Sequence, residues 1–217
     1  MIKAVIFDLD GLLLDTEMIS YQIYKDILDE YGYEYSEEEY VKDYCGKTEI
    51  INVTNLIETY NLPFDVEEGL QKVLAYENKL LSQGVALKKG VNELLAYLKE
   101  NNYKTAIATS STKDRALNLL NQHQIANQFD YFVYGFEVTK GKPNPDIFIK
   151  ACEKLDERPE DCLVLEDSEA GVCAAYSANI PVICIPDMKK PSKEIMEKTR
   201  AVFSSLDEVI SYLSSLK

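Results

Sequence analysis

The sequence predicts an α/β protein with a Rossmann-like parallel-sheet core and an inserted all-helical cap domain. Three features carry this prediction: an apolar run over residues 2–7, a stretch with helical periodicity and no convincing strand over residues 16–82, and strands that alternate with helices from residue 85 onward. A single strand and a helical module cannot bury the first apolar run, so that strand must join the later ones. We therefore expect a discontinuous catalytic core (residues 1–15 and 83–217) and a cap domain (residues 16–82).

The first strand and the first helix follow directly from the residue pattern. Residues 2–7 are apolar except for Lys3 and rich in β-branched side chains, which is typical of a strand buried on both faces of a parallel sheet. After Thr16 the period changes to that of a helix, which Gly32 ends. Its apolar and aromatic positions recur every four residues: Ile19, Ile23, Ile27 and Tyr31.

The other elements follow from apolar spacing and from turn residues. In the cap we expect a helix that begins at Ser36, with Glu39 at the third position after it, and two more over residues 50–60 and 66–81. Core strands are expected over residues 103–109, 131–134, 163–165, 182–185 and 202–203. Core helices are expected over residues 90–99, 113–123, 145–155, 170–177, 192–198 and 206–216.

Composition places the chain among ordinary soluble globular proteins. It has 217 residues, of which 46% are hydrophobic and 28% charged, and it contains neither a run of about 18 apolar residues nor a signal segment. We therefore expect a cytoplasmic protein without a membrane partner, and a monomer needs no further assumption. A formal net charge of −14 argues against nucleic-acid binding. The cysteines are scattered without a C-x-x-C pair, as in a protein that uses them as small core residues: Cys45, Cys152, Cys162, Cys173 and Cys184.

Two carboxylates stand where the first strand ends. Asp8 and Asp10 are two residues apart, so in an extended chain their side chains point the same way. Like charges at that spacing need a cation or a proton between them. In an open α/β sheet the carboxyl ends of the strands are also where ligands bind. The alternative is that both residues occupy a turn or cap the next helix.

Three later strand ends add complementary groups. Thr109 and Ser110 offer a hydroxyl and backbone N–H groups that suit an anion, and Lys142 supplies a cation. Glu166 and Asp167 add two carboxylates, and an oxygen-rich cluster without His or Cys suits Mg²⁺. Each group also has a structural interpretation, as a helix cap or a solvated lysine. Their recurrence at successive carboxyl ends of one sheet favours a functional site.

At these residues the sequence resembles the haloacid dehalogenase superfamily of hydrolases, in the subgroup with a helical cap inserted after the first strand. The matching motifs run through the whole chain: Asp8-Leu9-Asp10-Gly11, Asp15-Thr16, Thr109, Lys142-Pro143 and Glu166-Asp167. The resemblance implies a Mg²⁺-dependent phosphatase acting on a small phosphorylated metabolite. Dehalogenation is excluded within this family, because the dehalogenases work without metal and lack the second Asp of the motif.

The resemblance also implies a role for each matching residue. Asp8 would attack phosphorus and form an aspartyl phosphate, while Asp10 would protonate the leaving oxygen and then activate water. Thr109, the Ser110 N–H and Lys142 would bind the transferring phosphoryl oxygens. Mg²⁺ would be held by the Asp8 side chain, the Asp10 carbonyl, Asp167 and Glu166.

The cap residues bear on the substrate. The mutase-like pattern of beta-phosphoglucomutase has a His early in the first cap helix and a Lys and an Arg beside the cap's glycine loop, where this chain has Ser20, Cys45 and Glu49. A mutase must clamp a second phosphate, for which Arg is suited. We therefore favour a phosphatase similar to pseudouridine-5′-phosphatase and 2-deoxyglucose-6-phosphatase, with Glu17, Ser20 and Lys47 as substrate contacts.

Two alternatives remain open from the sequence. One is a beta-phosphoglucomutase-type hexose-phosphate mutase. The other is a non-catalytic phospho-Asp switch that resembles a response-regulator receiver. A receiver, however, carries its phosphorylated Asp on a later strand and has no large cap after the first strand.

Overall fold

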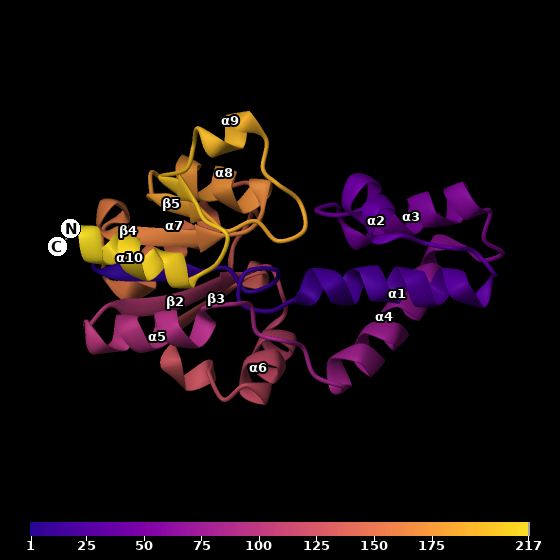
Figure 1. Ribbon diagram of the computed structural model, residues 1–217, viewed down its shortest axis with the longest axis horizontal. Helices are drawn as coiled ribbons and strands as arrows, with labels where there is room; N and C mark the ends of the chain where they lie inside the picture. Colours follow the sequence, from indigo (N-terminus) through magenta and orange to yellow (C-terminus); the bar gives the residue numbers. More distant parts are fainter. Residues whose placement is uncertain (217) are drawn as a thin grey trace. The chain divides into compact units, whose positions relative to one another are not determined.

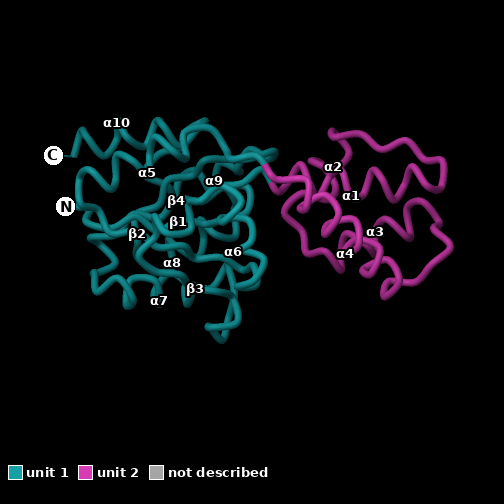
Figure 2. Tube along the Cα trace, turned by 90° about the horizontal axis from the view of Figure 1, so that it is seen from below, with its two compact units in different colours: residues 1–15, 86–217 teal, residues 16–85 magenta. Residues whose placement is uncertain are grey.

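The computed structural model describes residues 1–216 of the chain and divides them into two compact units. Residues 1–15 and 86–217 form one unit, and residues 16–85 form the other. Figure 2 colours the units separately. We call them the core unit and the helical unit.

The core unit is built on a sheet of six strands in the order β3-β2-β1-β4-β5-β6. All neighbouring strands run parallel. The first strand lies in the middle of the sheet, where Phe7 is paired with Ile107 on one side and Leu165 on the other. The strands are β1 (Ala4–Phe7), β2 (Lys104–Thr109), β3 (Tyr131–Tyr134), β4 (Cys162–Glu166), β5 (Val182–Cys184) and β6 (Ala201–Val202).

Helices cover both faces of this sheet. The contacts place α7 (Asp146–Leu155) and α8 (Glu169–Ser177) on one face, and α5 (Val91–Glu100) with α10 (Asp207–Ser215) on the other, as Figure 2 shows. The core unit also contains α6 (Lys113–Gln122), α9 (Lys193–Met196) and three short 3₁₀ turns over Ala126–Gln128, Gly135–Glu137 and Pro159–Asp161. Every residue of β1 is fully buried, which explains its unbroken apolar sequence.

The helical unit contains four helices, labelled in Figure 1: α1 (Thr16–Glu30), α2 (Glu37–Asp43), α3 (Glu49–Tyr60) and α4 (Val66–Ser82). The Ser36 side chain accepts from the Glu39 N–H at 3.1 Å and so caps α2, as the sequence pattern predicts. Asp65 caps α4 in the same way, accepting from the Glu68 N–H at 2.9 Å. Contacts between α1 and α4 and between α3 and α4 hold the helices together.

The chain leaves the core unit and returns to it along two paired segments. The Asp15 N–H donates to the Ala86 carbonyl at 3.0 Å, and the Lys88 N–H donates to the Leu13 carbonyl at 2.9 Å. Leu14 and Leu87 form an antiparallel bridge between these bonds. The insertion therefore begins and ends at neighbouring points of the core unit.

The predicted fold class is confirmed, and the differences lie at element ends. The helix expected over residues 192–198 covers only Lys193–Met196: Ser192 has the extended backbone of an N-cap, and Glu197 is the C-cap. The strand expected to begin at residue 103 begins at Lys104, after Asn102 in the left-handed region (φ 57°). Across residues 1–216, none of the helices combines the length and the apolar character that a membrane crossing requires.

Candidate active site

The site is built where β1 and β4 end side by side. The Asp8 N–H donates to the Leu165 carbonyl at 3.1 Å, which continues the pairing of the two strands by one residue. Asp8 is the first residue after β1, and Glu166 is the last residue of β4. The parallel register therefore brings the carboxylates of Asp8 and Glu166 to the same edge of the sheet.

A buried lysine joins these two carboxylates. The Lys142 ammonium donates to Asp8 Oδ1 and, at 2.6 Å, to Glu166 Oε1. The side chains of Lys142, Asp8 and Glu166 are only 9%, 10% and 0% exposed. The ammonium also lies 5.1 Å from the centre of the Phe148 ring. Lys142 precedes Pro143 through a cis peptide bond, in a segment outside regular structure.

Burial and charge shift the pKa values of this group in defined directions. Burial raises the pKa of Asp8 to about 7; Lys142 acts against the shift, and the charges of Glu166 and Asp10 add to it. Burial alone would lower the pKa of Lys142, but Asp8 and Glu166 raise it well above its ordinary value. Lys142 is therefore a permanent cation in a site with excess negative charge.

Glu166 is fixed by the start of the following helix. Its Oε2 accepts from the Asp167 N–H at 3.0 Å, from the Ser168 N–H at 3.1 Å and from the Ser168 hydroxyl at 2.9 Å. A Cβ on Gly171 would collide with the Glu166 carboxylate, so the helix can approach only because residue 171 is glycine. The N-cap of α8 is Ser168, which accepts from the Gly171 N–H, so Glu166 holds the turn before the helix while it belongs to the charged cluster.

Asp167 completes a group of oxygens that fits a divalent cation. One carboxylate oxygen each from Asp8, Glu166 and Asp167 lies within 4.8 Å of the others. Gly11 (φ 77°) leaves room for Asp167, because a Cβ there would collide with the Asp167 carboxylate. Hard oxygen ligands in a buried acidic cluster are the donor set that Mg²⁺ prefers.

Asp10 has partners of its own. Its Oδ2 accepts from the Ser111 hydroxyl at 2.7 Å, and its Oδ1 accepts from an Arg115 guanidinium nitrogen at 2.6 Å. The same nitrogen donates to the Ser111 hydroxyl at 2.6 Å. Asp8 and Asp10, only two residues apart, are thus bonded to different cations, Lys142 and Arg115.

Thr109 and Ser110 lie at the end of β2. Thr109 is 1% exposed, and its hydroxyl accepts from the Ser111 N–H at 3.0 Å. Ser110 is exposed. The N-cap of α6 is Thr112, which accepts from the Arg115 N–H at 3.4 Å, so neither Thr109 nor Ser110 is used as the helix cap.

The three residues predicted in the cap lie in the helical unit. Glu17 and Ser20 are on α1; the Glu17 carboxylate accepts from the Tyr40 hydroxyl at 2.5 Å and from the Cys45 thiol at 3.5 Å. The Ser20 hydroxyl donates to the Thr16 carbonyl at 3.4 Å. Lys47 is exposed in the loop between α2 and α3.

The sequence reasoning missed three participants: Ser111, Arg115 and Asp187. Arg115 lies in the first turn of α6, and its guanidinium reaches back to the Ser111 hydroxyl. Asp187 follows β5 and its Oδ2 lies 3.3 Å from the position of a Cβ on Gly11. An Asp placed two residues after the expected end of a parallel strand, residue 185, was a signal of the same kind as Asp10.

Comparison with known proteins places the chain in a family. Residues 5–185 match the model of the haloacid dehalogenase-like hydrolases. The chain belongs to this family. The match includes both strands that carry the acidic cluster, β1 and β4, together with the helical unit between residues 16 and 85.

Named relatives cover nearly the whole chain. A phosphorylated carbohydrates phosphatase of Thermotoga maritima is 31% identical over 215 residues, which cover 99% of each protein. A probable pseudouridine-5′-phosphatase of Drosophila melanogaster is 35% identical over 208 residues, covering 93% of this chain and 89% of that protein. The prediction of a family hydrolase of the phosphatase type is confirmed at this level.

A solved structure shows the same fold. A Thermotoga maritima protein described as a candidate beta-phosphoglucomutase superposes with a TM-score of 0.86, with 30% identity and complete coverage of both chains. The chain therefore shares its architecture with a protein described as a candidate mutase, while the two sequence relatives described above are named phosphatases, and the fold alone does not separate the two reactions.

Proposed function

We propose that the chain is a Mg²⁺-dependent phosphatase that hydrolyses small organic phosphate monoesters through an aspartyl-phosphate intermediate. The observation that carries the proposal is the Lys142 ammonium between the carboxylates of Asp8 and Glu166, with Asp167 beside them. Phosphoryl transfer depends chiefly on positioning and on neutralising charge. This buried cluster supplies a carboxylate nucleophile together with a cation that can neutralise the phosphoryl group.

Asp8 is the nucleophile in this proposal. Its carboxylate oxygen attacks phosphorus, the bond from phosphorus to the ester oxygen breaks, and the phosphoryl group is transferred to Asp8. Lys142 binds a phosphoryl oxygen and holds the attacking carboxylate in place. The buried Thr109 hydroxyl and the Ser110 N–H bind the remaining phosphoryl oxygens while the phosphoryl group is transferred.

Asp10 is the acid and base. It donates a proton to the leaving ester oxygen and then accepts a proton from the water that attacks the phosphorus of the intermediate, which releases inorganic phosphate and restores Asp8. Ser111 and Arg115 hold the Asp10 carboxylate apart from Lys142, which supports a separate role for the two aspartates.

The cation would be held by the Asp8 side chain, the Asp10 carbonyl, Glu166 and Asp167. Bound Mg²⁺ supplies positive charge that offsets the repulsion between an anionic nucleophile and an anionic substrate.

The organic part of the substrate is assigned to the helical unit. We include Glu17, Ser20 and Lys47 as its contacts, and a sugar or nucleoside phosphate as the substrate class, because the relatives are named for such substrates. The protein would act as a monomer, since one chain supplies every proposed residue. Five free thiols agree with the reducing environment of the cytoplasm.

The test is phosphate release from a panel of sugar and nucleoside monophosphates, with Mg²⁺ and with EDTA. Metal-dependent release is expected, and Asp8→Asn should lower it at least about 10³-fold. Asp161→Asn is the matched control, because it makes the same change at a buried aspartate near the amino end of β4. It should retain the activity.

The hexose-phosphate mutase is the second candidate, supported by the structural neighbour described as a candidate beta-phosphoglucomutase. It predicts no net phosphate release, and conversion of beta-glucose 1-phosphate to glucose 6-phosphate once a bisphosphate primer is added. That result would establish the mutase reaction and contradict the phosphatase proposal. A stable phosphoprotein without turnover would indicate the phospho-Asp switch instead.

A further inference from the structure

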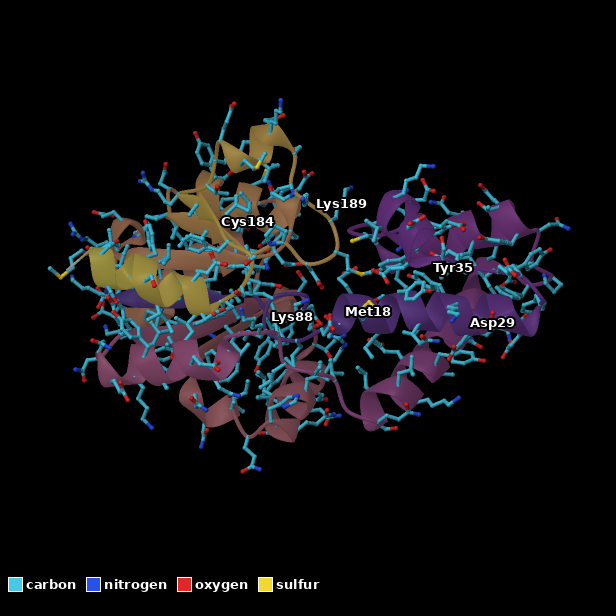
Figure 3. The ribbon with its side chains drawn as sticks, in the orientation of Figure 1. Met18, Asp29, Tyr35, Lys88, Cys184 and Lys189 are labelled. Carbon is cyan, nitrogen blue, oxygen red and sulfur yellow. The ribbon has the colours of Figure 1, made fainter. Side chains whose placement is uncertain are left out.

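Asp187 is a buried carboxylate beside the proposed metal ligands. It follows β5, the strand next to β4, three residues after Cys184, which is labelled in Figure 3. Its side chain is 7% exposed, and its Oδ1 accepts from the Lys88 ammonium at 2.5 Å. Lys88, also labelled in Figure 3, contacts Asp15 at 3.3 Å as well, so one ammonium serves two carboxylates.

The second oxygen of Asp187 is not satisfied by the protein. Among the described residues, Oδ2 is buried and has no hydrogen-bond partner. A buried carboxylate oxygen without a partner loses its hydration without compensation, and native proteins rarely leave one unpaired. The Lys88–Asp187 ion pair accounts for Oδ1 alone.

This oxygen lies next to Asp167. The position that a Cβ would occupy on Gly11 is 3.3 Å from Asp187 Oδ2 and 3.0 Å from Asp167 Cγ, so both carboxylates border the same small space. Gly11, with its φ of 77°, keeps that space open. Asp187 Oδ2 is therefore directed toward the acidic group that fits Mg²⁺.

We infer that Asp187 is a positioning residue of the magnesium site, whose Oδ2 accepts a hydrogen bond from a water ligand of the cation. The inference rests on the proposed function, because it needs Mg²⁺ at Asp8, Glu166 and Asp167. Mg²⁺ keeps several water ligands when it binds to proteins, and those waters need acceptors. Lys88 holds Oδ1, which leaves Oδ2 as the acceptor and orients it.

The test measures Mg²⁺ affinity directly, by isothermal titration calorimetry on the metal-stripped full-length protein. In Asp187→Asn the amide oxygen stays on Lys88, and the NH₂ group is directed toward the cation's waters, where it cannot accept. The affinity for Mg²⁺ should fall at least about tenfold. Asp161→Asn makes the same substitution at a buried, ion-paired aspartate at the amino end of β4, away from the proposed metal ligands. It should leave the Mg²⁺ affinity unchanged.

The outcomes separate the inference from the function on which it rests. If the Mg²⁺ affinity of Asp187→Asn is within twofold of the wild-type affinity, the role of Asp187 is overturned while the proposed phosphatase function stands. If the wild-type protein binds no Mg²⁺, both the role of Asp187 and the proposed Mg²⁺-dependent phosphatase function are overturned. If Asp187→Asn does not fold, Asp187→Ser, which also removes the carboxylate, is measured against the same criterion, with circular dichroism to confirm folding.

Discussion

The two ends of the central sheet both carry ionic clusters, but with opposite balances of charge. At the amino ends of the strands, four cations (Lys3, Lys104, Arg158 and the Met1 ammonium) bind three carboxylates (Glu157, Glu160 and Asp161). At the carboxyl ends, Lys142 contacts both Asp8 and Glu166, with Asp167 within 4.8 Å. Cations outnumber carboxylates in the first cluster and are outnumbered in the second.

The pKa values follow this difference. At the amino end, the hydrogen bond from Arg158 lowers the pKa of Asp161, and the hydrogen bond from Lys104 lowers that of Glu157. At the carboxyl end, burial raises the pKa of Asp8 to about 7 in spite of Lys142. The first cluster stabilises its charges without a ligand, whereas the second concentrates negative charge that a cation would relieve. This contrast is typical of a structural ion-pair network and a functional site on one scaffold.

The largest expected effect is on kcat, and it distinguishes Lys142 at the carboxyl end from Lys104 at the amino end. Lys142→Met should lower kcat for phosphate release by about 10²–10³-fold, because it removes a buried cation from the transferring phosphoryl group. Lys104→Met removes a lysine of the amino-end cluster and should leave kcat within twofold. Steady-state kinetics on purified variants checks both. Equal losses in the two variants would mean that the two ends do not differ in function.

The second prediction concerns pH and the carboxyl end. A carboxyl group whose pKa is raised by folding stabilises the folded protein at low pH, and this contribution is lost as the pH rises from about 4 to about 7. Asp8→Asn removes that loss. In metal-free protein, its free energy of unfolding should therefore rise relative to the unchanged protein over this range, by up to about 1.4 kcal/mol per pH unit. Urea unfolding followed by circular dichroism measures it, and a constant difference across the range would contradict the assignment.

At the amino end the sign is reversed. Because ion pairing lowers the pKa of Asp161 on folding, its contribution is present at neutral pH and is lost as the pH falls below about 4. Asp161→Asn should therefore destabilise the protein at pH 7 and less so at pH 3. Thermal unfolding at both pH values checks this. A destabilisation that grows on acidification would show that the ion pairs of Asp161 do not control its pKa.

The smallest effect is expected for Arg158, whose side chain is 69% exposed. Exposed ion pairs contribute little and are screened by salt, so Arg158→Met should lower the melting temperature by no more than about 4 °C, and by less at high salt. Activity should not change. A loss of activity in this variant would show that the amino-end cluster affects the active site, and would contradict a purely structural role for that cluster.

Much of this molecule could be predicted from the sequence, because residue periods and strand-end motifs are local signals. The apolar run before Asp8 and the alternation after residue 85 define the sheet, and the carboxyl-end rule places Asp8 and Glu166 on one edge of it. The partners of individual atoms could not be predicted in this way. Asp10 precedes a turn at Gly11 and bonds to Arg115, 105 residues away, an interaction that depends on the packing of α6 and leaves no local pattern.

Asp187 shows the same limit. Its role depends on the space left by Gly11 and on Lys88, 99 residues earlier in the chain. Sequence spacing identifies a glycine and an acid, but only tertiary packing reveals that one oxygen of that acid is buried with no hydrogen-bond partner among residues 1–216. Contacts between residues that are far apart in the chain leave no periodic pattern in the sequence.

In the proposed reaction, the phosphoryl group passes from the substrate to Asp8 at the carboxyl end of the sheet before water receives it. The most direct measurement is the stereochemical course at phosphorus, with a substrate monoester made chiral by ¹⁶O, ¹⁷O and ¹⁸O and an alcohol as acceptor. Two successive in-line displacements predict net retention of configuration. Net inversion would mean a single direct displacement by the acceptor, and would contradict an aspartyl-phosphate intermediate.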